Sequence, residues 1–124
     1  MAAYRHECKH EINTSDFITL SMRLNAALKA DEFARADGAY EITSLYFDDV
    51  YGTALKEKIS GVNCRDKFRL RRYNNDTEHI KLEKKSKRGG FCLKESAAIT
   101  STQAQSIIGG DIDFLAAQGG VMAE

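Results

Sequence analysis

Polar and apolar residues alternate in three consecutive segments of this chain, with lysines and arginines concentrated on the polar side, and this pattern limits its fold more than any other feature. The segments are Cys64–Tyr73, residues 78–87 and Phe91–Ile99. Side chains of a β-strand alternate between the two faces of a sheet, so the pattern places cations on one face and apolar residues on the other. The sequence therefore predicts an antiparallel meander of three strands with one basic face.

The alternation assigns individual residues to each face. Phe68, Leu70, Ile80 and Leu82 fall on the apolar side, which we expect to pack on helices. Lys84 falls on the side opposite Lys85. The predicted basic face consists of Arg65, Lys67, Arg69, Arg71, Lys81, Glu83, Lys85, Cys92, Lys94 and Ser96.

The remaining segments predict two more strands and several helices. Residues 4–13 alternate in character, with Arg5, Glu7, Lys9 and Glu11 on one face, and residues 40–48 are rich in aromatic and β-branched residues, so both predict strands. Helical spacing of apolar residues predicts helices over 15–29, 51–59 and from Thr100 to about residue 108, with a further turn or two in 111–117. Thr14 or Ser15 is the expected cap of the first helix, and Gly61 is expected to end the second. The predicted fold class is α+β.

Charge is segregated along the chain, although the formal net charge of its 124 residues is zero. Residues 56–94 contain 13 lysines and arginines against 5 aspartates and glutamates, an excess of eight positive charges. Such segregation favours a polyanion site, and an exposed basic face without a dedicated ligand is the alternative.

Composition indicates one ordinary globular domain, residues 1–124, in the cytoplasm. Hydrophobic residues make up 43% of the chain and charged residues 29%. No apolar run is long enough to cross a bilayer, and the N-terminus lacks the apolar core of a secretion signal. The three cysteines are an odd number at wide spacing, which fits a reducing compartment better than a disulfide framework.

A basic face this dense needs negative charge nearby, because like charges repel more strongly as a site is buried. Glu7 and Glu83 are candidate counter-charges, and phosphate groups would supply the remainder, since arginine binds phosphate oxygens in a bidentate fashion. Nucleic acid is the weaker alternative as a ligand, because only Tyr73 is available on this face for base stacking.

Five short motifs in a fixed order carry a family resemblance. They are Arg5-His6-Glu7-Cys8-Lys9, Ser44-Leu45-Tyr46-Phe47-Asp48, Phe68-Arg69-Leu70-Arg71-Arg72-Tyr73, Lys81-Leu82-Glu83-Lys84-Lys85-Ser86-Lys87 and Leu93-Lys94-Glu95-Ser96. From about Arg5 to Leu115 the chain resembles the vacuolar transporter chaperone (VTC) domain, a family of the triphosphate tunnel metalloenzymes.

The resemblance implies a fold, an activity and a set of site residues. The fold would be an antiparallel β-tunnel with flanking helices, and the activity the transfer of the ATP γ-phosphate to a polyphosphate chain with Mn²⁺ or Mg²⁺. By resemblance, Lys9, Arg69, Arg71, Lys85 and Lys94 bind the phosphates, and Arg69, Arg71 and Lys85 are the catalytic residues. Glu7 and Glu83 are possible metal ligands, and an ion pair with a neighbouring cation is the favoured alternative for Glu7. A non-catalytic module that binds polyphosphate, inositol phosphates or triphosphate is the alternative function.

Two departures from the family pattern refine these expectations. Relatives with triphosphatase or cyclase activity begin with Glu-x-Glu-x-Lys, whereas here Glu7 is followed by Lys9 and Glu11, so those activities are not expected. Family domains are also much longer, and we expect this chain to form about half of the tunnel, its N-terminal part, with exposed sheet edges that favour self-association or a completing partner chain.

Residues that could be mistaken for reactive groups have simpler expected roles. We expect His6 and His10 to be structural and His79 to be exposed near a turn. Tyr46 and Asp48 are expected to be structural, because aromatic residues in strands usually pack. Cys92 would face the tunnel as a small filler, since phosphoryl transfer to polyphosphate needs no protein nucleophile.

Overall fold

The computed structural model describes residues 3–117, and these divide into two units. Residues 3–7 and 41–117 form the first, called here the sheet unit, and residues 8–40 form the second, the helical unit. Each unit is described by itself. No helix within residues 3–117 is both long enough and apolar enough to span a bilayer.

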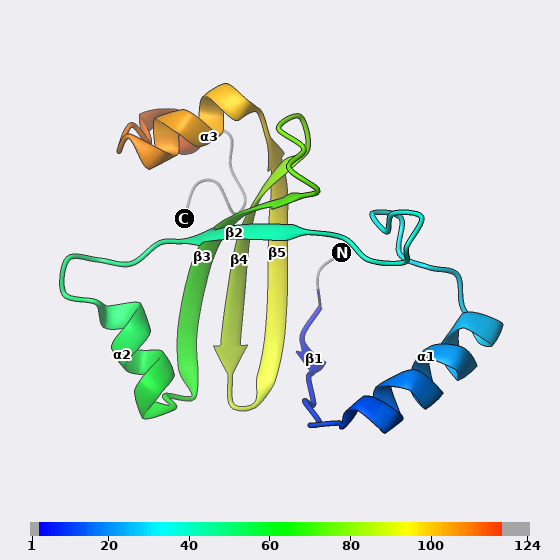
Figure 1. Cartoon of the computed structure of the whole chain (residues 1–124). Coiled ribbons are helices and arrows are strands. Elements are labelled where there is room, and N and C mark those ends of the chain that lie inside the picture. The colour runs from blue at the N-terminus through cyan, green and yellow to red at the C-terminus, as the bar shows by residue number, and fades with distance from the viewer. Residues whose placement is uncertain (1–2, 118–124) are drawn as a thin grey trace. The chain divides into compact units, whose positions relative to one another are not determined.

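The sheet unit contains one antiparallel sheet of five strands in the order β1-β5-β4-β3-β2 (Figure 1). The strands are β1 (Arg5–His6), β2 (Ile42–Tyr46), β3 (Cys64–Tyr73), β4 (Ile80–Arg88) and β5 (Phe91–Ile99). The predicted α+β class and the β3-β4-β5 meander are confirmed. The sheet is open: β1 and β2 are its edges, and residues 3–117 do not close it into a tunnel.

The first strand is much shorter than predicted, because its partner strand begins too late to extend it. β1 pairs with β5 only through Arg5 with Cys92 and His6 with Phe91. In this antiparallel register, Glu7 lies beyond the start of β5, where the chain turns through Gly89 and Gly90. The His6 and Phe91 rings pack at 4.3 Å between centroids, which agrees with a structural role for His6.

The fourth strand begins at Ile80 rather than at residue 78, because a turn extends further than expected. Asn74 and Asn75 have positive φ angles of 52° and 58°. The Asp76 carboxylate then accepts hydrogen bonds from the backbone N–H groups of Glu78 at 2.7 Å and His79 at 3.3 Å. Such a side-chain cap holds the backbone in a turn and delays entry into the sheet.

The helical unit contains α1 (Thr14–Ala27), which agrees with the predicted helix except at its ends. Asn13, not Thr14 or Ser15, is the N-cap. Its side chain accepts a hydrogen bond from the Asp16 N–H at 2.8 Å, and the Asp16 carboxylate accepts one from the Asn13 N–H at 3.3 Å. This reciprocal capping box satisfies two backbone donors at once, which explains the earlier start.

Helix α2 (Thr53–Ser60) follows β2 and ends at Gly61, as predicted. Asp48 accepts hydrogen bonds from the N–H groups of Ala54 and Leu55, and Asp49 accepts one from that of Thr53. Two carboxylates at a helix N-terminus are stabilised by its dipole. The hydrogen bond from the Ala54 N–H lowers the pKa of Asp48, and the hydrogen bonds from the hydroxyl and N–H of Thr53 lower that of Asp49. Asp48 therefore has the structural role expected of it.

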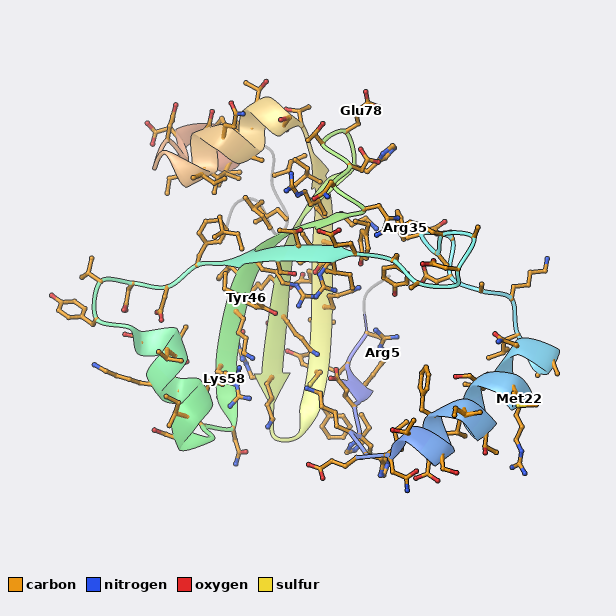
Figure 2. All side chains as sticks on the ribbon, viewed as in Figure 1. Arg5, Met22, Arg35, Tyr46, Lys58 and Glu78 are labelled. Atoms are coloured by element: carbon orange, nitrogen blue, oxygen red, sulfur yellow. The ribbon has the colours of Figure 1, made fainter. Side chains whose placement is uncertain are left out.

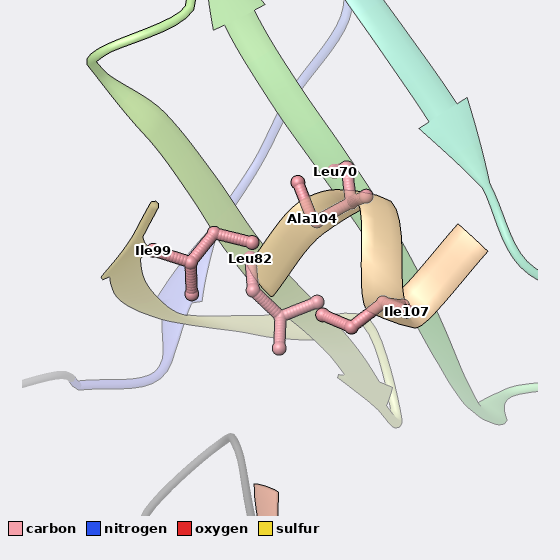
Figure 3. Close-up of a cluster of buried hydrophobic side chains, with 5 residues drawn as sticks. All are labelled: Leu70, Leu82, Ile99, Ala104 and Ile107. Carbon is pink, nitrogen blue, oxygen red and sulfur yellow. The ribbon is translucent and has the colours of Figure 1, made fainter. Parts of the chain in front are cut away.

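The core lies on the sheet face that carries the apolar side chains. Helix α3 (Ser101–Ile108), capped by Thr100 as predicted, packs on this face, and the short helix η1 (Asp113–Leu115) follows. Figure 3 shows the buried cluster, which consists of Leu70, Leu82, Ile99, Ala104 and Ile107. Because α3 covers this side of the sheet, the opposite face is left to the cations.

Candidate anion-binding site

The strand register places the predicted cations on one face of the sheet. Directly paired residues in antiparallel strands project to the same side. Lys67 pairs with Lys85, and Lys85 pairs with Lys94. One row further along, Arg69 pairs with Glu83, and Glu83 pairs with Ser96. Arg71 follows on the same face, opposite Lys81. This face of β3, β4 and β5 is called here the cationic face.

Glu83 is the centre of the cationic face. It is only 1% exposed, and its carboxylate contacts three cations. Its Oε2 lies 2.6 Å from Arg69 Nε and 3.9 Å from Arg71 Nε, and its Oε1 lies 3.8 Å from Lys94 Nζ. A buried carboxylate requires such compensation, so these contacts explain how the fold tolerates both Glu83 and the converging cations.

Arg69 and Arg71 also form hydrogen bonds with side chains of the edge strand β2, on the side of β3 opposite to Glu83. Arg69 donates a hydrogen bond through Nη1 to the Tyr46 hydroxyl at 3.0 Å, and Arg71 donates one through Nε to the Ser44 hydroxyl at 3.2 Å. The hydrogen bond from Arg69 lowers the pKa of Tyr46, with Arg71 and Lys67 adding to the effect. Among residues 3–117, the Nη2 of Arg69 and both Nη atoms of Arg71 have no hydrogen-bond partner, which leaves them available to a ligand.

The ion pair between Lys85 and Glu7 joins β4 to the segment after β1. Lys85 Nζ lies 2.5 Å from Glu7 Oε2, and both side chains are about one-third exposed, at 34% and 38%. This contact agrees with the ion-pair interpretation of Glu7, and its possible role as a metal ligand stays a prediction. The pair keeps the Lys85 ammonium at the rim of the cationic face, where an anion can compete for it.

A cleft of about 390 Å³ lies over the cationic face. Four cations and one carboxylate are among its lining residues, which are Arg5, His6, Glu7, Arg69, Lys85, Cys92 and Lys94. Figure 2 shows Arg5 on β1 and Tyr46 on β2, the two edge strands. Arg5 is absent from the site residues predicted by resemblance, but its alternation with Glu7 was a signal in the sequence that could have found it. Cys92 lines the cleft, as the alternation predicts.

The roles of Lys9 and of a divalent metal ion are among the predicted features that remain untested. Lys9 belongs to the helical unit, so its role stays a prediction. Within residues 3–117, no group of three or more histidine, cysteine, aspartate or glutamate side chains could hold a metal ion. The possible ligands Glu7 and Glu83 are each paired with cations, so the described residues do not by themselves fit a metal ion.

The fold and this face define an α+β protein whose open antiparallel sheet presents a partly neutralised cluster of cations around a buried carboxylate. Comparison with protein families identifies the group to which it belongs. The family model of the VTC domain matches residues 4–123, nearly the whole chain, and the chain therefore belongs to the VTC domain family. No curated protein matches the chain.

Proposed function

We propose that the cationic face binds the phosphate chain of ATP and of polyphosphate, and that the complete domain transfers the ATP γ-phosphate to a growing polyphosphate chain. The observation that carries this proposal is the convergence of Arg69, Arg71 and Lys94 on the buried carboxylate of Glu83. One carboxylate cannot neutralise three cations, so the face retains positive charge for a polyanion. Membership of the VTC domain family supports the same function.

The geometry suggests how the arginines would act on a phosphate. Arg69 is held at Nε by Glu83 and at Nη1 by Tyr46, and Arg71 is held at Nε by Ser44. Guanidinium groups fixed in this way lose little freedom when their remaining N–H groups bind phosphate oxygens. Fixed donors also stabilise the charge that develops on a phosphoryl group during transfer.

The lysines would complete the site as point charges. Lys85 and Lys94 occupy the row next to Arg69 and line the same cleft. As the ligand enters, Lys85 would exchange its contact with the Glu7 carboxylate for one with a phosphate oxygen. The phosphate would then replace Glu7 as the negative charge beside Lys85. Arg69, Arg71 and Lys85 would contact the transferred phosphoryl group, and Lys94 would contact the rest of the phosphate chain.

The divalent ion implied by the family, Mn²⁺ or Mg²⁺, remains a prediction. Glu7 and Glu83 are paired with cations, and residues 3–117 contain no group of three or more possible metal ligands, so the metal would be held mainly outside these residues. The tunnel remains a proposal in the same way: the open edges β1 and β2 would pair with further strands of a complete domain or with a partner chain.

A non-catalytic phosphate-binding module is the second candidate. The observation that favours it is the positive charge of the cationic face, because lysines and arginines can bind phosphate without a metal ion. Both functions require phosphate binding, and only the first requires turnover of ATP.

Calorimetric titration of the chain with tripolyphosphate tests the shared requirement. Arg69→Met and Arg71→Met should each weaken binding by roughly tenfold, because each removes charged hydrogen bonds. The matched control is Lys84→Met, on the same strand as Lys85 but on the opposite face. Equal binding by all three variants would contradict the proposal. Incubation of the complete domain with ATP and Mn²⁺ then separates polymerase from binding module by the presence or absence of polyphosphate.

A further inference from the structure

A second pocket lies beside the cationic face, where α2 approaches the sheet. Its volume is about 310 Å³. Its wall combines apolar side chains with two lysines, and the lining residues are Tyr46, Phe47, Asp48, Ala54, Leu55, Lys58 and Lys67. In Figure 2, Lys58 on α2 and Tyr46 on β2 lie close to β3.

The two lysines of this pocket have no carboxylate partner among residues 3–117. Asp48, the acidic residue in the lining, accepts hydrogen bonds from the backbone N–H groups of Ala54 at 2.9 Å and Leu55 at 3.1 Å, so its charge is directed to the start of α2. Lys67 is partly buried, and its pKa is lowered by that burial and by the nearby charges of Arg65 and Lys58. Lys58 and Lys67 thus repel each other across a pocket whose one carboxylate, Asp48, is hydrogen-bonded to the start of α2.

The pocket is continuous with the cationic face. Lys67 pairs directly with Lys85, which pairs with Lys94, so a row of three ammonium groups crosses β3, β4 and β5. Tyr46 borders the pocket and also accepts the hydrogen bond from Arg69. An anionic chain bound over Glu83 therefore has a positively charged path across Lys67 to α2.

We propose that Lys58 and Lys67 form a second phosphate subsite, which binds phosphate groups of a linear chain that extends beyond the part held around Glu83. The subsite rests on the proposed function of the cationic face and adds a preference for longer chains. An anion is the occupant that fits, because it would offset the repulsion between the two lysines, neither of which has a carboxylate partner among residues 3–117.

The test compares the affinities of the protein for linear phosphates of different length. The intact chain is titrated with pyrophosphate, tripolyphosphate and a longer linear polyphosphate, and the ratio of the longer chain's affinity to that of tripolyphosphate is measured. Lys58→Ala should lower this ratio by roughly tenfold, and Lys67→Met should do the same. The matched control is Lys56→Ala, on the same helix but outside the pocket lining, which should leave the ratio unchanged.

The outcomes separate this subsite from the proposed function. If tripolyphosphate binds and the ratio is the same in Lys58→Ala and the unmodified chain, the second subsite is wrong while the cationic face stands. The same conclusion follows if Lys56→Ala lowers the ratio equally, because the effect would then be one of net charge. If no phosphate compound binds the unmodified chain, both proposals fail. Circular dichroism of each variant checks that α2 is retained.

Discussion

The carboxylate of Glu83 lies 2.6 Å from the Nε of Arg69, although the Glu83 side chain is only 2% exposed. This contact places a buried negative charge among the cations of the cationic face. It also fixes the direction of the Arg69 guanidinium, whose Nη1 reaches Tyr46 on the neighbouring strand. The pairing therefore links the stability of the sheet to the orientation of the groups that we propose bind phosphate.

Replacing Glu83 by glutamine should destabilise the chain and make it more dependent on phosphate. Glutamine keeps the shape and an acceptor for Arg69 Nε but removes the charge shared with Arg71 and Lys94, at a cost of about 3 kcal/mol in the free energy of unfolding. Tripolyphosphate should raise the Tm of Glu83→Gln more than that of the unmodified chain, because it replaces the lost negative charge. Thermal denaturation with and without tripolyphosphate measures both effects. An equal shift in the two proteins would show that Glu83 does not compensate the phosphate-binding cations.

Truncating Leu82 should test the packing of α3 on the sheet. Leu82 is 5% exposed and belongs to the buried cluster with Ile107. Leu82→Ala should lower the free energy of unfolding by about 2–5 kcal/mol, since it removes buried methyl groups and leaves a cavity. The control is Ile59→Ala on α2, where the side chain is 76% exposed, and the change should stay within about 0.5 kcal/mol. Urea denaturation gives both values, and similar losses would refute this assignment of the core.

The pKa of Tyr46 should lie below the ordinary tyrosine value, because the hydrogen bond from Arg69 and the surrounding positive charges favour the phenolate. A folded-state pKa below the unfolded value means that stability increases as the pH rises through the interval between them and that this gain is lost as the pH falls. Ultraviolet difference titration should show an early phase that is missing in Tyr46→Phe and shifted to higher pH in Arg69→Met. An early phase that persists in Tyr46→Phe would assign it to another tyrosine.

The Asp66–Arg88 pair should stabilise the fold at neutral pH and lose this contribution in acid. Arg88 Nη2 lies 2.9 Å from the Asp66 carboxylate, and its hydrogen bond lowers the Asp66 pKa. The contribution of the pair to stability is therefore complete above the ordinary aspartate pKa and is lost as the pH falls through the lowered pKa of Asp66. Both side chains are about one-third exposed or more, so solvent screening keeps this contribution small. Stability curves against pH for Arg88→Met and the unmodified chain should converge in acid; parallel curves would exclude the pair as the cause.

The open edges of the sheet should make the chain associate. Strand β2 has an unpaired edge in the described structure, and its Ile42 and Leu45 side chains are 44% and 45% exposed. Light scattering after gel filtration should show a mass that rises with concentration, and Leu45→Lys should reduce this rise by placing a charge on the edge strand. A monomer at all concentrations would argue against edge pairing.

Local pattern in the sequence was sufficient for most of the elements. Alternation predicted β3 and β5 with their observed ends and placed Arg69, Arg71, Lys85 and Lys94 on one face, because side-chain period in a strand depends only on the backbone. Local chemistry also predicted the Thr100 cap and the end of α2 at Gly61. Where prediction missed, as at β1 and the start of β4, the limit came from a partner strand or a side-chain cap.

By itself, the sequence determined the α+β class, the strand alternation and the excess of positive charge on one side of the sheet. Only the tertiary structure decided which acid balances which cation, because that depends on the register between paired strands. Register brings Glu83 beside Arg69, and the antiparallel pairing of β1 with β5 brings Glu7 to Lys85 across 78 residues. Tertiary packing also placed Lys58 of α2 beside Lys67 of β3, a proximity that no periodicity in either segment contains.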